Sequence, residues 1–132
     1  MTPAGYSGKP LVEKLGIRPG LTVYVGQGPS YVDELLDGAA YTTRLPKRAD
    51  VVLTFHDQRR TLERRLPTLE DHLVGHGMIW VCWPKRSSGV PTDLTENVVR
   101  ELALGMGLVD VKVCAVDDTW SGLKLVRRLK DR

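Results

Sequence analysis

Apolar residues fall into short continuous runs that alternate with segments of helical periodicity. The continuous runs are rich in Val and Leu and predict five strands, at 21–26, 50–55, 78–83, 108–116 and 122–129. Turn-forming residues at 117–121 connect the last two runs directly and predict a hairpin. Residues 39–43 form a weaker run, in which we expect at most a brief strand.

Two short helices are expected near the N-terminus. The first covers residues 10–15, with Ser7 as its cap and Gly16 just past its end. The second covers residues 31–38, and Ser30 precedes it as a cap.

A longer helix is predicted over residues 57–74, where leucines recur at steps of four, three and four and form one apolar face: Leu62, Leu66, Leu69 and Leu73. Pro67 lies inside this pattern, so we expect either a kink or a second helix that starts after Leu66. Gly75, His76 and Gly77 are expected to end it.

A last helix is expected from residue 92 to about Met106, with Thr92 or Asp93 as its cap. Asp93 and Glu96 have the spacing of a capping box, with Asp in place of the usual Ser or Thr.

The alternation of strands and helices predicts an α/β fold in which a mainly parallel sheet is flanked by helices and ends in an antiparallel β-hairpin. We expect one domain over residues 1–132. Ligands of such sheets bind beyond the carboxyl ends of the strands. The loops expected at that edge are 26–30, 56–58, 84–91 and 117–121.

Composition narrows the class of protein. The 132 residues are 42% hydrophobic and 27% charged, as in soluble globular proteins, and no apolar run is long enough to span a membrane. The N-terminal residues lack the pattern of a secretory signal, and two cysteines do not make a disulfide framework, so we expect a cytoplasmic protein. A net charge of +3 is modest, and we do not expect nucleic acid as a partner.

Two glycines follow the first predicted strand and open the next helix. Gly26 and Gly28 stand where a glycine-rich turn can hold a nucleotide near a helix N-terminus. The full pattern of three glycines is incomplete, because Tyr31 occupies the last position. The alternative is that both glycines only make the turn between strand and helix.

The loop after the third predicted strand carries the cluster of polar residues that most strongly indicates a binding site. Lys85, Arg86, Ser87 and Ser88 precede the expected helix N-terminus, so cations, hydroxyls and backbone amides would converge on a phosphate or carboxylate. The alternative is a solvated loop with no ligand.

Other rim residues carry weaker hypotheses. His56 and Asp57 end the second strand, where an acid or base would face the rim, although Asp57 also suits a helix cap. Asp117 and Trp120 lie at the hairpin tip, where they could contact a ligand, or could make the turn and anchor it. No metal site is expected, because Gly75 separates His72 from His76.

The segment LGIRPGLTVYVGQGPS resembles the opening strand and turn of class I S-adenosylmethionine-dependent methyltransferases. The terminal hairpin is also similar to theirs, and the resemblance implies a truncated Rossmann-like fold. Tyr24 replaces the family's acid, and residues 38–50 are too few for the usual two strands and helices that hold ribose and adenine.

A second resemblance covers nearly the whole chain. The segments GYSGKPLVEKLGI, WPKRSS and TDLTENVVRELALGMGLVDVKVCAVDDTWSGLKLV are similar to those of domain of unknown function 3052, a family of small bacterial proteins. This resemblance implies a bacterial cytoplasmic protein and no defined activity.

The methyltransferase resemblance also implies a strand order. Its last strand inserts into the sheet, so strand 78–83 should border strand 122–129 and not strand 108–116. Cys82 and Cys114 would then lie about 10 Å apart, beyond the reach of a disulfide.

We expect a non-catalytic protein that binds a small anionic ligand or has a regulatory role on a degenerate methyltransferase-like scaffold. The expected ligand-binding residues are Gly26, Gly28, Lys85, Arg86, Ser87, Ser88, Asp117 and Trp120. No catalytic residue is identified and no cofactor is expected. Two alternatives stay open, a small methyltransferase that uses S-adenosylmethionine and a structural module that binds a partner or forms a homodimer.

Overall fold

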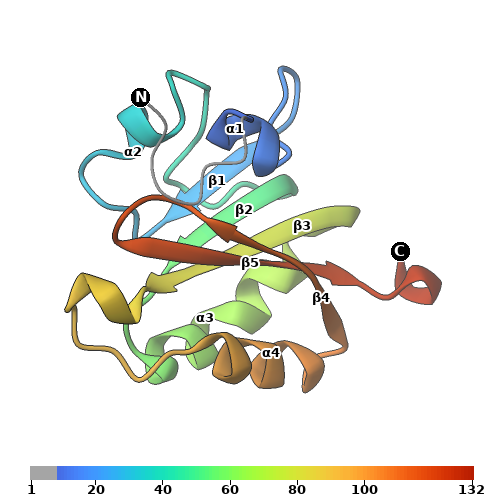
Figure 1. Cartoon of the computed structure of the whole chain (residues 1–132). Coiled ribbons are helices and arrows are strands. Elements are labelled where there is room, and N and C mark those ends of the chain that lie inside the picture. Colours follow the sequence, from blue (N-terminus) through green and yellow to red (C-terminus); the bar gives the residue numbers. More distant parts are fainter. Residues whose placement is uncertain (1–8) are drawn as a thin grey trace.

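The computed structural model describes residues 9–132, which build a five-stranded sheet with the order β1-β2-β3-β5-β4 (Figure 1). Its strands are β1 (Val23–Gly26), β2 (Ala49–Phe55), β3 (Leu73–Pro84), β4 (Leu108–Ala115) and β5 (Trp120–Arg127). Parallel pairing joins β1 to β2 and β2 to β3, whereas β5 is antiparallel to both β3 and β4. The predicted α/β fold with a terminal antiparallel hairpin is confirmed.

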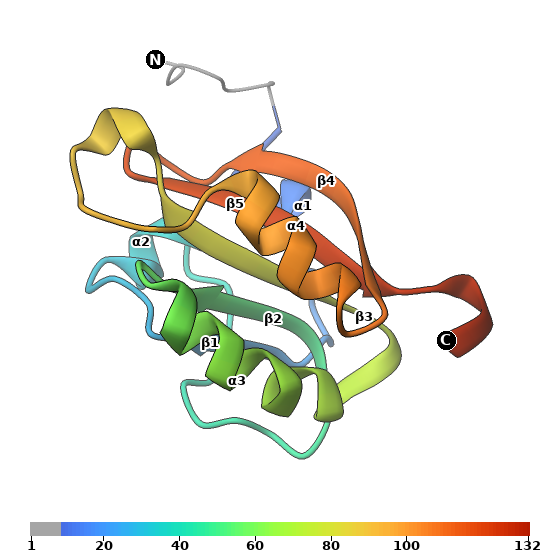
Figure 2. The same cartoon turned by 90° about the horizontal axis from the view of Figure 1, so that it is seen from below.

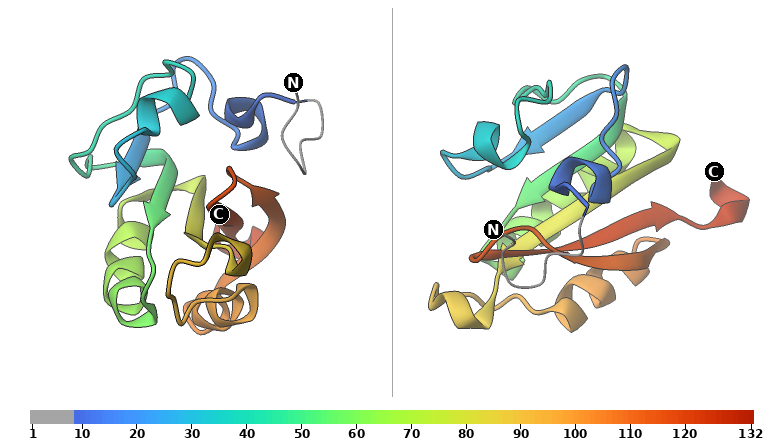
Figure 3. Two further views of the ribbon diagram at one scale, coloured as in Figure 1. Left: turned by 60° about the vertical axis from the view of Figure 1, so that its left-hand side comes forward. Right: turned by 45° about the horizontal axis from the view of Figure 1, so that its top comes forward.

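Helices lie on both faces of this sheet (Figures 2 and 3). One face is covered by α3 (Arg59–Asp71) and α4 (Glu96–Leu104). The one-turn helices α1 (Leu11–Lys14) and α2 (Val32–Leu35) belong to the opposite face. Two single 3₁₀ turns complete the elements, η1 (Arg86–Ser88) and η2 (Leu129–Asp131).

The apolar face predicted for the long helix packs as expected. Leu62, Leu66 and Leu69 on α3 are each at most 1% exposed. Pro67 lies inside one continuous helix, so of the two expected outcomes the second helix after Leu66 does not form. The lost hydrogen bond and ring clash of a helical proline cost about 3 kcal/mol, and burial of the flanking leucines at about 2 kcal/mol each offsets that cost.

The predicted end of this helix is also wrong, because α3 stops at Asp71. Leu73 is already the first residue of β3, and Gly75 to Gly77 lie within that strand. A Cβ at Gly77 would be 2.9 Å from the carbonyl oxygen of Asp50, so glycine there lets β3 approach β2 closely.

The helix caps differ from the predicted ones. Tyr31 and not Ser30 precedes α2, and Ser7 lies outside the described residues. Helix α4 starts four residues later than expected, and the Oγ1 of Thr95 caps it by accepting a hydrogen bond from the amide of Val98. Asp93 instead accepts the amide hydrogen bond of Arg59 at 2.6 Å, so it caps α3 from another part of the chain.

The predicted position of the last strand is confirmed, because β3 pairs with β5 and not with β4. Cys82 and Cys114 both pair with Gly122, from opposite sides of β5, and both are free thiols. The brief strand expected at 39–43 is a single bridge between Thr42 and Tyr24. No helix within residues 9–132 is long and apolar enough to cross a membrane.

Candidate functional site

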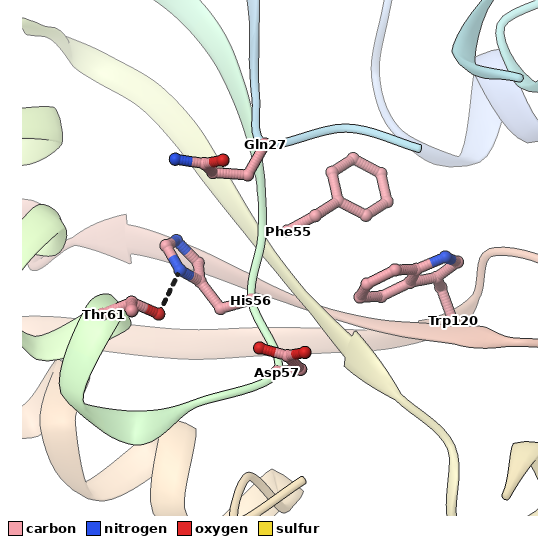
Figure 4. A pocket seen from close by; sticks show the side chains of 6 residues that line it. All are labelled: Gln27, Phe55, His56, Asp57, Thr61 and Trp120. Carbon is pink, nitrogen blue, oxygen red and sulfur yellow. Dashed lines mark hydrogen bonds between the residues drawn. The ribbon is translucent and has the colours of Figure 1, made fainter. Parts of the chain in front are cut away.

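A pocket of about 280 Å³ opens where the carboxyl ends of β1 and β2 meet the start of β5 (Figure 4). Six residues line this recess, which we call the His56 pocket: Gln27, Phe55, His56, Asp57, Thr61 and Trp120. Gln27 follows β1, three of the residues come from the end of β2 and the loop after it, and Thr61 lies in the first turn of α3. The pocket therefore occupies the sheet edge at which α/β proteins bind their ligands.

His56 is held in one tautomer by its neighbours. The hydroxyl of Thr61 donates to the carbonyl oxygen of Gln58, at 3.0 Å, so its oxygen accepts from Nδ1–H of His56, also at 3.0 Å. The other ring nitrogen, Nε2, then accepts from the hydroxyl of Thr54 at 2.6 Å. Both ring nitrogens are therefore engaged within the protein.

The same surroundings keep His56 uncharged. Its side chain is 5% exposed, and burial is the main cause that lowers the pKa of its imidazole to about 4. The positive charge of Arg65 adds to this decrease, and Asp57 opposes it. A neutral imidazole with both nitrogens engaged is not placed to act as a general base, so His56 shapes the pocket wall.

Gln27 enters the pocket from a strained backbone. Its φ of +59° lies in the left-handed region, which residues other than glycine enter at a cost of about 1–2 kcal/mol. Figure 4 shows its side chain at the edge of the pocket, opposite Phe55. Sequence reasoning missed this residue, although its place between two turn glycines was a usable signal.

The opposite wall is aromatic. The rings of Phe55 and Trp120 meet edge to face with their centroids 5.0 Å apart. Asp57 lies at the rim with its carboxylate exposed to solvent. The pocket thus combines an apolar wall, an exposed carboxylate and a carboxamide.

The two predicted glycines serve the protein's own packing. A Cβ at Gly28 would lie 2.6 Å from a methyl carbon of Val32 and 2.8 Å from one of Val25. A Cβ at Gly26 would lie 2.8 Å from the hydroxyl oxygen of Tyr24. Neither glycine lines the pocket, so their placement agrees with the alternative that they make the turn.

Tyr24, which the methyltransferase resemblance places at the position of that family's acid, contacts α3. Its hydroxyl oxygen accepts a hydrogen bond from Nη2 of Arg65 at 2.9 Å. The guanidinium carbon of Arg65 also lies 5.9 Å from the centre of the tyrosine ring. This pair fills the space beside Gly26 with protein atoms.

A second recess follows the end of β3. This recess, which we call the Lys85 groove, has a volume of about 510 Å³ and is lined by residues 83–86, 89–92 and 94–96 and by Ser121. It contains Lys85 and Arg86 of the predicted anion loop. Ser87 is exposed and does not line it.

Two groups near the predicted anion loop are engaged in hydrogen bonds within the chain. The hydroxyl of Ser88 donates to the carbonyl oxygen of Lys85 at 2.6 Å and accepts from the amide of Val90, so it stabilises its own turn. The N-terminus of α4 meets the groove at Thr95 and Glu96, where the Thr95 side chain already caps it. The Ser88 hydroxyl and the Val98 amide of α4 therefore have partners within the chain.

The predicted hairpin residues have separate roles. Asp117 closes the turn, because its Oδ1 accepts from the amides of Thr119 and Trp120 at 2.8 and 2.7 Å. Burial raises the pKa of the Tyr31 phenol, and the Asp117 carboxylate adds to that increase. Trp120 reaches the His56 pocket, whereas Asp117 does not line it.

The two recesses share a wall. The hydroxyl of Thr92, in the Lys85 groove, donates to the carbonyl oxygen of Asp57, in the His56 pocket, at 2.7 Å. Pro84 pairs with Trp120 across β3 and β5. The described part of the chain places no three His, Cys, Asp or Glu side chains where they could hold a metal ion.

Comparison with solved structures identifies the fold. A ribosomal protein L11 methylase from Lactobacillus delbrueckii subsp. bulgaricus aligns with a TM-score of 0.61 and 12% identity, over 89% of this chain and 75% of that one. A SAM-dependent methyltransferase from Aquifex aeolicus aligns with a TM-score of 0.63 and 11% identity, over 87% and 86% of the two chains. The chain has a truncated Rossmann-like methyltransferase fold.

A third methyltransferase was solved with its methyl donor. Magnesium protoporphyrin IX methyltransferase from Synechocystis PCC 6803, with bound SAM, aligns with a TM-score of 0.58 and 14% identity, over 89% and 74% of the two chains. No family model and no curated protein matches the chain, so the resemblance to domain of unknown function 3052 is not confirmed. Beside β1, where the methyltransferase resemblance implies further strands, this chain has the single bridge at Thr42.

Proposed function

We propose that the protein is a small S-adenosylmethionine-dependent methyltransferase whose His56 pocket binds the methyl donor. The observation that carries this proposal is the place of the pocket. It opens at the Gly-Gln-Gly turn after β1 and at the end of β2, in a methyltransferase fold. The non-catalytic protein expected from the sequence becomes the second candidate.

The residues of the pocket suit a cationic ligand. S-adenosylmethionine carries a positive sulfonium, whose methyl group is the electrophile that an acceptor oxygen, nitrogen or sulfur attacks. The face of Trp120 and the exposed carboxylate of Asp57 both favour a positive charge. His56 is uncharged at neutral pH, so it adds no repulsion toward that charge.

The rest of the ligand has fewer partners. The side-chain amide of Gln27 is available to hydroxyl or ring nitrogen atoms. At about 280 Å³ the pocket lies just below the range of about 300–1,000 Å³ that is usual for drug-sized ligands. We therefore expect it to enclose the sulfonium end, leave the nucleoside partly exposed, and bind with micromolar rather than nanomolar affinity.

Isothermal titration with S-adenosylmethionine and S-adenosylhomocysteine tests the proposal. Binding near micromolar Kd, which corresponds to about −8 kcal/mol, is the expected result. Asp57→Asn should weaken S-adenosylmethionine about fivefold and S-adenosylhomocysteine less, because only the former is a sulfonium. Asp118→Asn is the matched control, since Asp118 is an exposed carboxylate that does not line the pocket.

The same titration separates the second candidate. A non-catalytic protein on this scaffold is favoured by Tyr24 in place of the acid and by the short segment beside β1. If neither compound binds at about 1 mM, the methyltransferase proposal is rejected in favour of the non-catalytic protein.

A further inference from the structure

The Lys85 groove has the surface of a site for an amphipathic molecule. Its apolar lining includes Trp83 and Leu94, which are 7% and 2% exposed, and Val90, which is 39% exposed. Lys85 and Arg86 add two positive charges to the same lining. With about 510 Å³, the groove is larger than the His56 pocket and within the usual range for small-molecule sites.

The charges in the groove do not cancel. Its one carboxylate belongs to Glu96, which forms an ion pair with Arg100 on the next turn of α4. Within residues 9–132, Lys85 and Arg86 have no carboxylate partner, whereas Arg59 and Arg127 each have one and Arg100 has two. The groove therefore presents uncompensated positive charge to whatever enters it.

The backbone that carries these cations is fixed. The amide of Lys85 donates to the carbonyl oxygen of Thr119 at 2.7 Å, which ties the loop to the β4–β5 turn. The carbonyl oxygen of Lys85 accepts from both the amide and the hydroxyl of Ser88, at 3.0 and 2.6 Å. A pre-organised turn loses less entropy when a ligand binds than a free loop does.

The groove also borders the His56 pocket. Ser121 lines the groove and its neighbour Trp120 lines the pocket, while the Thr92 hydroxyl bonds to the backbone of Asp57. A molecule in the groove thus lies beside the pocket proposed for the methyl donor.

We propose that the Lys85 groove binds the methyl acceptor, and that this acceptor is an organic anion in which a phosphate or carboxylate is attached to an apolar body. The acceptor role rests on the function proposed above, whereas the class of ligand rests on the groove alone. Lys85 and Arg86 hold the anionic group, and Trp83, Leu94 and Val90 contact the apolar body.

Phenyl phosphate is the test probe, with benzoate as its carboxylate counterpart and with inorganic phosphate and phenol as its separate halves. Binding is measured by titration calorimetry and thermal shift at constant ionic strength, without S-adenosylmethionine. Phenyl phosphate or benzoate should bind more tightly than phosphate or phenol. The double variant Lys85→Ala/Arg86→Ala should weaken the better of these two probes at least tenfold.

The chain offers a matched control with the same dipeptide. Lys47 and Arg48 are both exposed and lie outside the groove, so Lys47→Ala/Arg48→Ala removes the same charge elsewhere. This control should bind the probe within about twofold of the unmodified chain. Equal weakening in both double variants, or absence of binding by both phenyl phosphate and benzoate at about 10 mM, would overturn the inference.

S-adenosylhomocysteine separates the two proposals. The Lys85→Ala/Arg86→Ala variant should bind it within about twofold of the unmodified chain, because those residues line the groove and not the pocket. If the probe binds but S-adenosylhomocysteine and S-adenosylmethionine do not, the acceptor role falls with the proposed function. If the nucleosides bind and the probe does not, this inference fails and the proposed function stands.

Discussion

The buried imidazole of His56 should make the stability of the protein depend on pH. Its pKa is about 4 in the folded chain, against about 6.5 for an exposed histidine. Between these values the unfolded chain binds more protons, so the free energy of unfolding falls as the pH is lowered. The physical cause is burial, because protonation would place a positive charge on a ring that is 5% exposed and whose Nε2 accepts a hydrogen bond from Thr54.

The size of the effect follows from the two pKa values. Linkage gives a loss of about 2 kcal/mol between pH 7 and pH 4.5 from this one residue, and little further loss below pH 4. Above pH 7 the contribution is constant, because the ring is neutral in both states. Urea unfolding followed by tryptophan fluorescence measures this loss, since Trp80 and Trp83 are buried.

His56→Gln removes the titrating group. The free energy of unfolding of this variant should therefore change about 2 kcal/mol less over the same pH interval than that of the unmodified chain. His76→Gln is the matched control, because it makes the same replacement at an exposed position of β3. Parallel pH curves for the unmodified chain and His56→Gln would refute the reasoning. Should His56→Gln fail to fold, NMR titration of the unmodified chain reports the pKa of His56 directly, and a value near 6.5 would refute it equally.

Three further predictions concern the turn and the caps. Gln27→Gly should raise the free energy of unfolding by up to about 1 kcal/mol, and so should the control Asp37→Gly, because both residues have a positive φ. Only Gln27→Gly should weaken nucleoside binding measured by calorimetry, and equal affinity in both variants would count against a role of Gln27. Gly28→Ala should lower the free energy of unfolding in urea by about 1–3 kcal/mol, because the added Cβ meets two valines. Gly105→Ala should leave it unchanged, because the nearest contact of its Cβ is at 3.5 Å. An unchanged free energy in Gly28→Ala would show that the turn can relax. Thr95→Ala should lower the free energy of unfolding by about 1 kcal/mol and reduce the helicity of α4, because it removes the cap of that helix. Thr92→Ala should leave the helicity of α4 unchanged. If circular dichroism shows less helix in Thr92→Ala than in Thr95→Ala, the cap lies where the sequence suggested it.

Much of the fold could be read from local patterns. Runs such as 50–55 and 78–83 are largely apolar because parallel strands under two helical layers are buried on both faces, and both runs lie in strands. The insertion of the last strand between β3 and β4 was available only through the methyltransferase resemblance, since a hairpin alone does not say which of its strands joins the sheet.

The candidate site could be placed from the sequence but not described by it. The carboxyl ends of the parallel strands β1 and β2 put Gln27 and His56 on one edge, and Trp120 joins them because the antiparallel strand β5 starts at that edge. The expected ligand-binding residues were chosen by their chemical type. The type of a residue does not reveal whether its hydroxyl or carboxylate is already bonded within the chain. Ser88 and Asp117 are both engaged in their own turns, and Gly28 makes room for Val32.

The sequence by itself therefore determined the order of the elements, the buried strands and the edge of the sheet that carries the loops, because periodicity and turn residues act over a few positions. Tertiary structure alone decided which distant side chains become partners. Asp93 caps a helix whose first residue is 34 positions away, and the hydroxyl of Tyr24 accepts a hydrogen bond from Arg65, 41 positions away. Such contacts form between segments that only folding brings together, and no local pattern records them.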